Sequence, residues 1–93
     1  MQKNSRYIKV DPAILSDPQM GTLDDRTWRR AIELFLIANE FSRSSALPSI
    51  AEIAWTLRTT QEDVISVLKS LEQIGIASRV DQDNWHVTCF ALI

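Results

Sequence analysis

The chain has 93 residues, of which 45% are hydrophobic and 24% charged, with two glycines and three prolines. This composition is typical of one globular domain, and it excludes a disordered or fibrous protein and a second folded unit with its own core. The formal net charge of -2 excludes a protein whose whole surface attracts phosphate, so any contact with nucleic acid has to come from local basic patches.

Three features of the sequence predict a cytoplasmic protein without a membrane span. The longest apolar run, over residues 31–38, is interrupted by Glu33 and is far shorter than the roughly 20 residues that a span needs. The N-terminal sequence MQKNSRYIKV lacks the apolar stretch of a secretory signal. A single cysteine, Cys89, cannot form an internal disulfide, which favours a reducing compartment.

Residues 1–21 are predicted to form an N-terminal strand or arm followed by a short helical turn. Apolar and basic residues alternate over residues 7–10, which indicates a short strand. Pro12 favours a helical turn at residues 12–17. Basic residues in the N-terminal segment form either a flexible arm along a DNA backbone or an ordinary solvated tail. They are Lys3, Arg6 and Lys9.

Three helix starts are marked by a Ser or Thr followed three residues later by an acid. The hydroxyl of such a residue accepts a hydrogen bond from the first helical turn, and the acid reaches back, as in a capping box. The pairs are Thr22 with Asp25, Ser49 with Glu52, and Thr60 with Asp63.

Residues 22–75 are predicted to form a core of three helices. The first, over residues 24–41, carries apolar residues around most of its circumference, which is typical of a central core helix. These residues are Trp28, Ile32, Leu34, Phe35, Leu36, Ile37 and Phe41. The second and third helices each carry a one-sided apolar stripe. The stripes are Ile50, Ile53, Ala54 and Leu57, and Val64, Val67, Leu68, Leu71 and Ile74.

After Gly75, which we expect to end the third helix in the left-handed conformation, the apolar period changes from helical to alternating. Residues 76–90 therefore predict a β-hairpin around the polar turn 81–84. Residues 91–93 form an apolar tail. The alternating residues of the hairpin are Ile76, Ser78, Val80, Trp85, Val87 and Cys89.

The run IAEIAWTLRTTQEDVISVLKSLEQIGIASRV, residues 50–80, has the order helix, tight turn, helix, glycine and strand. It resembles the winged helix-turn-helix of bacterial and phage DNA-binding proteins. Short motifs in the wider chain are RYIKV, Asp17-Pro18, Leu23, Trp28-Arg29-Arg30 and LPSIAEIAWTLR. Together they resemble the N-terminal winged-helix domain of phage replisome organisers and DnaD-like replication initiation proteins.

The resemblance implies an α+β, mostly α fold: a winged helix-turn-helix with a three-helix core and a C-terminal β-hairpin wing, spanning residues 1–93 as one domain. It also implies origin DNA binding or self-association at the start of replication, in a bacterial or phage-infected cell. The implied partners are double-stranded DNA and either a second copy or a replication protein. Such proteins carry a further C-terminal region. The apolar residues 90–93 therefore indicate either that the chain is one domain of a longer protein or that a partner covers this tail.

By analogy with helix-turn-helix proteins, the third helix enters the major groove with its N-terminal half. We expect Gln61, Ser66 and Lys69 to contact the groove and Thr60 to donate to a phosphate. Arg79, on the first hairpin strand, reaches a phosphate or the minor groove, and the N-terminal Lys3, Arg6 and Lys9 follow the backbone. The alternative is that all of these residues form a solvated surface.

Two acids in the first turn of the third helix oppose the DNA hypothesis, because they repel phosphate. We expect Asp63 to be engaged by the helix cap and Glu62 to stabilise the positive end of the helix dipole. The acids favour a second hypothesis, a winged helix for protein interaction or oligomerisation. A transcription regulator of the same fold is a third. Trp55 either packs against the N-terminal segment, which we favour, or marks an exposed interaction patch.

No enzyme chemistry is indicated. A single histidine, His86, has no second ligand nearby, and Cys89 is interpreted as a small strand hydrophobe. Two isolated glycines give no phosphate-binding loop, and no acids form a close pair in an apolar setting. We therefore expect no catalytic residue, no metal, no cofactor and no small-molecule substrate.

Overall fold

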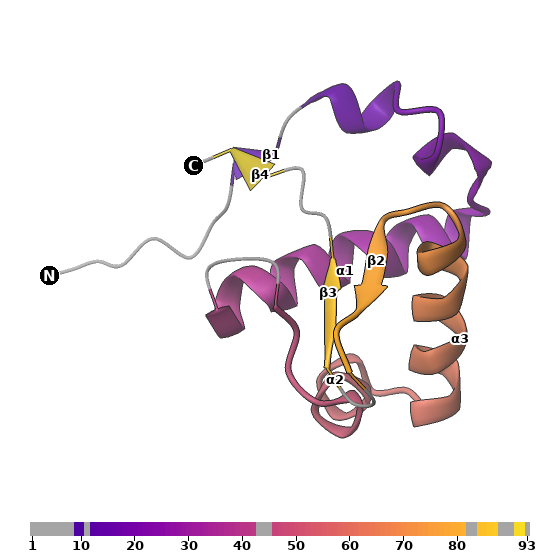
Figure 1. The fold of residues 1–93 in the computed structure, drawn as a ribbon. Coiled ribbons are helices and arrows are strands. Elements are labelled where there is room, and N and C mark those ends of the chain that lie inside the picture. Colours follow the sequence, from indigo (N-terminus) through magenta and orange to yellow (C-terminus); the bar gives the residue numbers. More distant parts are fainter. Residues whose placement is uncertain (1–8, 11, 43–45, 82–83, 88–90, 93) are drawn as a thin grey trace, which may run out of the picture.

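A computed structural model describes residues 9–10, 12–42, 46–81, 84–87 and 91–92 of the chain (Figure 1). Over these residues the fold is α+β and mostly helical, which confirms the fold class at that level. The helices are the 3-10 turns η1 (Pro12–Leu15) and η2 (Met20–Thr22), then α1 (Asp25–Ser42), α2 (Ile50–Leu57) and α3 (Gln61–Gln73). The strands are β1 (Lys9–Val10), β2 (Ala77–Arg79), β3 (Trp85–Val87) and β4 (Ala91–Leu92).

The core lies where α1 crosses behind the β2–β3 hairpin, with α3 beside the hairpin and α2 at one end (Figure 1). Each of these elements contributes apolar side chains that are almost completely buried, and their removal from water is the main stabilising contribution. The largest are Phe35 and Leu34 of α1, Ile53 of α2, Val64, Leu68 and Leu71 of α3, Val87 of β3 and Met20 of η2.

The N-terminal cap of α1 differs from the sequence prediction. Asp24, and not Thr22, caps the helix, since the Thr27 N–H donates to Asp24 Oδ1 at 2.8 Å. The Thr22 hydroxyl instead donates to the Gln19 carbonyl at 2.7 Å, within η2. Thr22 is already part of that 3-10 turn, so its side chain is directed back along the chain and is too early to cap α1.

The buried face of α1 is narrower than predicted. It consists of Ala31, Leu34, Phe35 and Ala38, whereas the side chains of Leu36 and Phe41 are 47% and 57% exposed. Their predicted burial is wrong. Of the described elements, α3 and β3 make the main contacts with α1, so its other side stays in solvent.

The caps predicted for α2 and α3 are confirmed. The Ser49 hydroxyl accepts from the Glu52 N–H at 3.2 Å, and the Thr60 hydroxyl accepts from the Asp63 N–H at 3.0 Å. Both helices therefore begin at the residue that follows a hydroxyl cap, as the local sequence dictates.

Two left-handed residues set the ends of α2 and α3. Gly75 has a φ of 80°, which confirms its predicted role after α3, and Arg58 has a φ of 57° after α2. Behind Gly75, the Ile76 N–H donates to Leu71 O at 2.9 Å. This bond is that of a Schellman motif, and it turns the chain from α3 towards the hairpin.

The hairpin is present, but its first strand has a different phase from the predicted one. Ala77 pairs with Val87 and Arg79 with Trp85, so Ser78 and Val80 do not belong to the inner face. Ser78 is exposed and Val80 is 61% exposed. The turn after α3 places Ile76 in the core before the strand begins, which shifts the alternation by one residue.

The N-terminal strand lies within the predicted segment but pairs with the tail. Strands β1 and β4 run antiparallel, with Lys9 opposite Leu92 and Val10 opposite Ala91. Within the described residues these two strands form their own sheet, separate from β2–β3 (Figure 1). The prediction of a flexible arm is therefore wrong at Lys9, whereas Lys3 and Arg6 lie outside the described residues, as does Cys89.

Candidate nucleic-acid interface

The outer face of α3 is polar and solvent-exposed. It is an open surface formed by α3 alone, and it comprises Glu62, Ile65, Ser66, Lys69, Ser70 and Gln73. Ser66 and Lys69 were among the residues selected from the sequence, and both are exposed. Gln61 is exposed at the start of the helix but does not belong to this surface. The helical period alone would have found Gln73, which lies four residues after Lys69.

Thr60 serves first as the N-cap of α3. Its hydroxyl oxygen accepts the Asp63 N–H, and the residue is exposed. A hydroxyl also has one proton to donate, so capping leaves the predicted donation to a phosphate possible in chemical terms.

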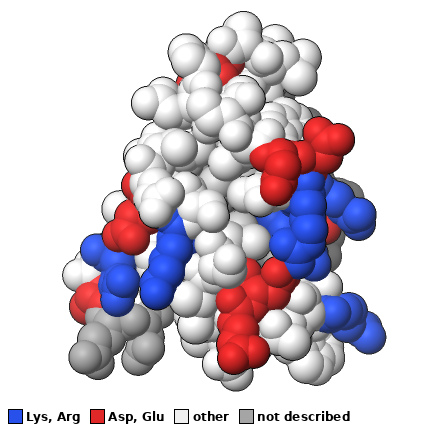
Figure 2. All heavy atoms as spheres, turned by 90° about the vertical axis from the view of Figure 1, so that its right-hand side faces the viewer, with Lys and Arg blue, Asp and Glu red and all other residues white. Residues whose placement is uncertain are grey.

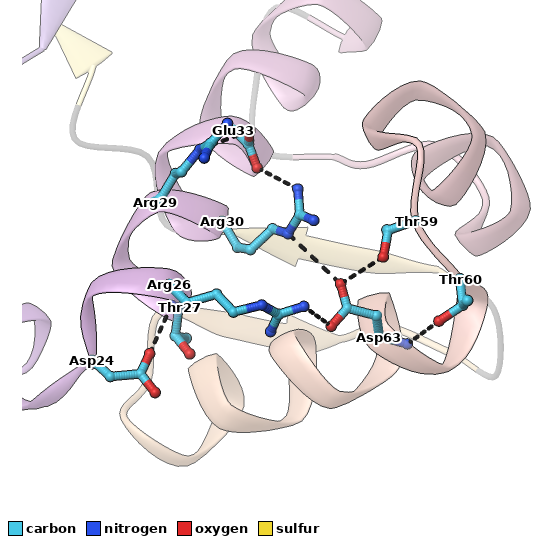
Figure 3. Close-up of polar contacts among 9 residues, drawn as sticks. All are labelled: Asp24, Arg26, Thr27, Arg29, Arg30, Glu33, Thr59, Thr60 and Asp63. Atoms are coloured by element: carbon cyan, nitrogen blue, oxygen red, sulfur yellow. Dashed lines mark hydrogen bonds and ion pairs between the residues drawn. The ribbon is translucent and has the colours of Figure 1, made fainter.

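Asp63, the second acid of α3, faces away from this outer surface. The Asp63 carboxylate points towards α1, where it contacts the Arg26 guanidinium, and Arg30 Nε lies 3.6 Å from Asp63 Oδ2 (Figure 3). The Thr59 hydroxyl donates to Asp63 Oδ2 at 2.9 Å. The prediction that the helix cap engages this carboxylate is wrong, because the cap uses the Asp63 N–H alone.

These contacts stabilise the charged form of Asp63. The hydrogen bond from Arg26 lowers the pKa of the Asp63 carboxyl below its ordinary value, and the Thr59 hydroxyl lowers it further. The same bond raises the pKa of Arg26. The Asp63 side chain is only 16% exposed, and two arginines on the side of α3 that faces α1 balance its charge.

The basic cluster at the start of α1 is largely neutralised in the same way. Arg30 Nη1 lies 2.8 Å from Glu33 Oε1, and Arg29 Nε lies 3.5 Å from Glu33 Oε2. Arg26, Arg29 and Arg30 thus meet two acids, Glu33 and Asp63 (Figure 3). Of these arginines, Arg29 is the most exposed, at 78% of its side chain.

Arg79 lies on the β2–β3 hairpin beside α3. Its guanidinium carbon is 5.1 Å from the centre of the Trp85 ring, directly across the strand pair. The ring is almost buried, whereas Arg79 is exposed. Stacking on the indole therefore holds this cation in place, and no acid among the described residues pairs with it.

Trp55 is an exposed residue of α2 near the turn between α2 and α3. Its side chain is 74% exposed, so the favoured interpretation of a packed tryptophan is wrong. The Arg58 guanidinium carbon lies 5.6 Å from the centre of its ring. Together they form an aromatic and basic patch at the end of α2.

Basic side chains do not form a continuous surface on the α3 side. Figure 2 shows them in separate groups, with neutral and acidic surface between. Any phosphate contact on this side is therefore local, as the net charge of the sequence implies.

No group of three potential metal ligands occurs among the described residues. Within the same part of the chain, no helix is long and apolar enough to cross a membrane. No protein-family model matches the chain, and neither does a curated protein or a solved structure.

Proposed function

We propose that this protein is a winged-helix module that binds duplex DNA, with α3 in the major groove and the β2–β3 hairpin as the wing. The element order supports this fold. So does the segment before α2, in which Leu47 N donates to Trp85 O at 2.9 Å and Ala46 forms a bridge with His86. This segment adds a third short extended piece beside the hairpin and ties the start of α2 to the wing.

The observation that carries the proposal is the orientation of Asp63. An acid in the first turn of α3 would repel phosphate if it faced the groove. Arg26 and Arg30 draw this carboxylate towards α1 and balance its charge. Of the two acids in the first turn of α3, only Glu62 therefore remains on the outer face, where it would repel phosphate.

The hydrogen-bonding groups of the outer face are available to a ligand. Within the described residues, the side chains of Gln61, Ser66 and Lys69 make no intramolecular hydrogen bond or ion pair. Amide, hydroxyl and ammonium groups are those that contact base edges and phosphates. Arg79 adds a cation on the wing.

The biological setting rests on the resemblance to phage replisome organisers and DnaD-like proteins. On that basis the module acts in replication initiation, in the cytoplasm of a bacterium or a phage-infected host cell. A transcription regulator would use the same surface and differ only in its target.

A second function, docking to another protein, is favoured by one observation. Trp55 exposes 74% of its side chain, and tryptophan is enriched at the centres of protein interfaces. Under this alternative, α2 and not α3 carries the interaction, and the partner is either a second copy or another replication protein.

Titration of a labelled duplex with the protein, at several salt concentrations, tests the DNA proposal. With about four phosphates neutralised, we expect a log-log salt slope of roughly -3 to -4. Lys69→Glu should weaken binding by about tenfold and make the slope shallower by about one contact. Arg29→Glu is the matched control, since it makes the same charge change on α1.

Equal effects of Lys69→Glu and Arg29→Glu would show that α3 does not face the DNA. Absence of duplex binding at low salt would contradict the function itself. If Trp55→Ala then abolishes self-association or partner binding, the docking function replaces it.

A further inference from the structure

We propose that Glu62 is the residue by which α3 selects its base pair, by accepting a hydrogen bond from the amino group of a cytosine in the major groove. The inference rests on the proposed DNA-binding function and assigns a specificity to its surface. It also changes the meaning of an acid that at first counts against DNA binding.

The position of Glu62 suits this role. Glu62, Ser66, Lys69 and Gln73 follow one another at intervals of four, three and four residues, so they lie along one line of α3. All four belong to the open outer surface of α3 and are exposed. Glu62 stands in the first turn, and the N-terminal residues of a recognition helix are those that contact base edges.

Glu62 is also free to bind. Its neighbour Asp63 is engaged by Arg26, Arg30 and Thr59, whereas no hydrogen bond or ion pair of the Glu62 side chain occurs within the described residues. One turn of one helix therefore carries two acids with different surroundings, and only Glu62 can meet a ligand.

The chemistry of the carboxylate restricts what it can accept from. An ionised carboxylate only accepts hydrogen bonds. In the major groove, thymine and guanine present acceptors, and adenine presents an acceptor beside its amino group, whereas cytosine presents an amino donor alone. A carboxylate therefore fits cytosine and repels the alternatives. An amide at the same position has both a donor and an acceptor, and fits adenine.

Selection of bound duplexes from a library with a randomised central segment tests the inference, using the full 93-residue chain. The wild-type protein should enrich a cytosine at one position. Glu62→Gln should shift that position to adenine and leave the other enriched positions unchanged. On single duplexes, each protein should prefer its own base by roughly 5- to 150-fold.

Glu72→Gln is the matched control, because it removes the same charge from an exposed position near the other end of α3. It should raise affinity for all duplexes alike without changing the selected base. If wild type and Glu62→Gln enrich the same sequence, or if neither enriches any, the inference is overturned while duplex binding stands. If the wild-type protein retains no duplex at low salt, the proposed function fails as well.

Discussion

The two sides of α3 place two consecutive acids, Glu62 and Asp63, in different environments. On the side that faces α1, Asp63 is only 16% exposed and bound by Arg26, Arg30 and Thr59. On the outer side, Glu62 is exposed on an open surface. The two acids are consecutive in the sequence, yet the rotation of about 100° per helical residue places them in different environments. The role of an acid on this helix is therefore set by the face on which it lies.

The difference between the two sides has a consequence for binding. The buried apolar stripe of α3 fixes its position in the core, and the ion pairs with α1 lie on the same inner side. Residues that stabilise the fold and residues that meet a ligand are thereby separated on one helix. Substitutions on the two sides should accordingly affect different measurements.

The largest effect on stability is expected on the apolar inner side. Leu68 is fully buried, and Leu68→Ala should lower the free energy of unfolding by about 2 to 5 kcal/mol through lost burial and a residual cavity. Urea melts with the midpoint and slope measured separately give this value. Lys69→Ala, one residue further on the exposed side, is the control and should change it by less than about 0.5 kcal/mol. Similar losses for both would mean that the two sides are not distinct.

A smaller effect is expected at the ion pairs. Asp63→Asn should cost about 1 kcal/mol at pH 7, since the pair with Arg26 is partly exposed. The contacts lower the folded-state pKa of Asp63, so its contribution is complete above the ordinary value of 3.8 and is lost as the pH falls through the folded-state value.

Thermal melts between pH 7 and pH 2 check this expectation. Wild type and Asp63→Asn should differ at neutral pH and converge in acid. Lys69→Ala serves again as the control on the outer side, and its melts should run parallel to those of the wild type. A constant difference between wild type and Asp63→Asn over the whole range would contradict the assigned ion pairs.

Effects of equal or smaller size are expected at the two turns that bound α3. Both turns contain a left-handed residue, but one is Gly75 and the other is Arg58. A left-handed conformation is unfavourable for a residue with a Cβ atom, so Gly75→Ala should cost about 1 kcal/mol although open space surrounds the site. Arg58→Gly should gain about 0.5 kcal/mol, because relief of strain exceeds the entropy of the new glycine. Urea melts measure both, and a loss on Arg58→Gly would show that its stacking on Trp55 outweighs the strain.

Features that depend on near neighbours in the sequence were predictable. The caps at Ser49 and Thr60 and the left-handed Gly75 follow from residue types within one turn, and the structure has them. The exposed positions of Gln61, Ser66 and Lys69 followed from the apolar stripe on the opposite side of the same helix. The candidate site on α3 was therefore largely defined by the sequence, apart from Gln73.

Features that depend on distant partners were not. Arg26 and Asp63 are 37 residues apart, and no local pattern connects them. The burial of α1 depended on which elements cover it, and Trp55 is exposed because none of the described elements covers α2 there. The turn after Gly75 shifted the phase of β2 by one residue and brought Arg79 opposite Trp85.

The sequence by itself thus determined the starts of α2 and α3, the left-handed turn at Gly75 and the polar outer face of α3, because hydrogen bonds and apolar spacing within one helix encode them. Only the tertiary structure decided that Asp63 pairs with the arginines of α1 and that Glu62 stays available to a ligand. Packing sets the rotation of α3 against α1, and this rotation determines which of two consecutive acids meets the arginines.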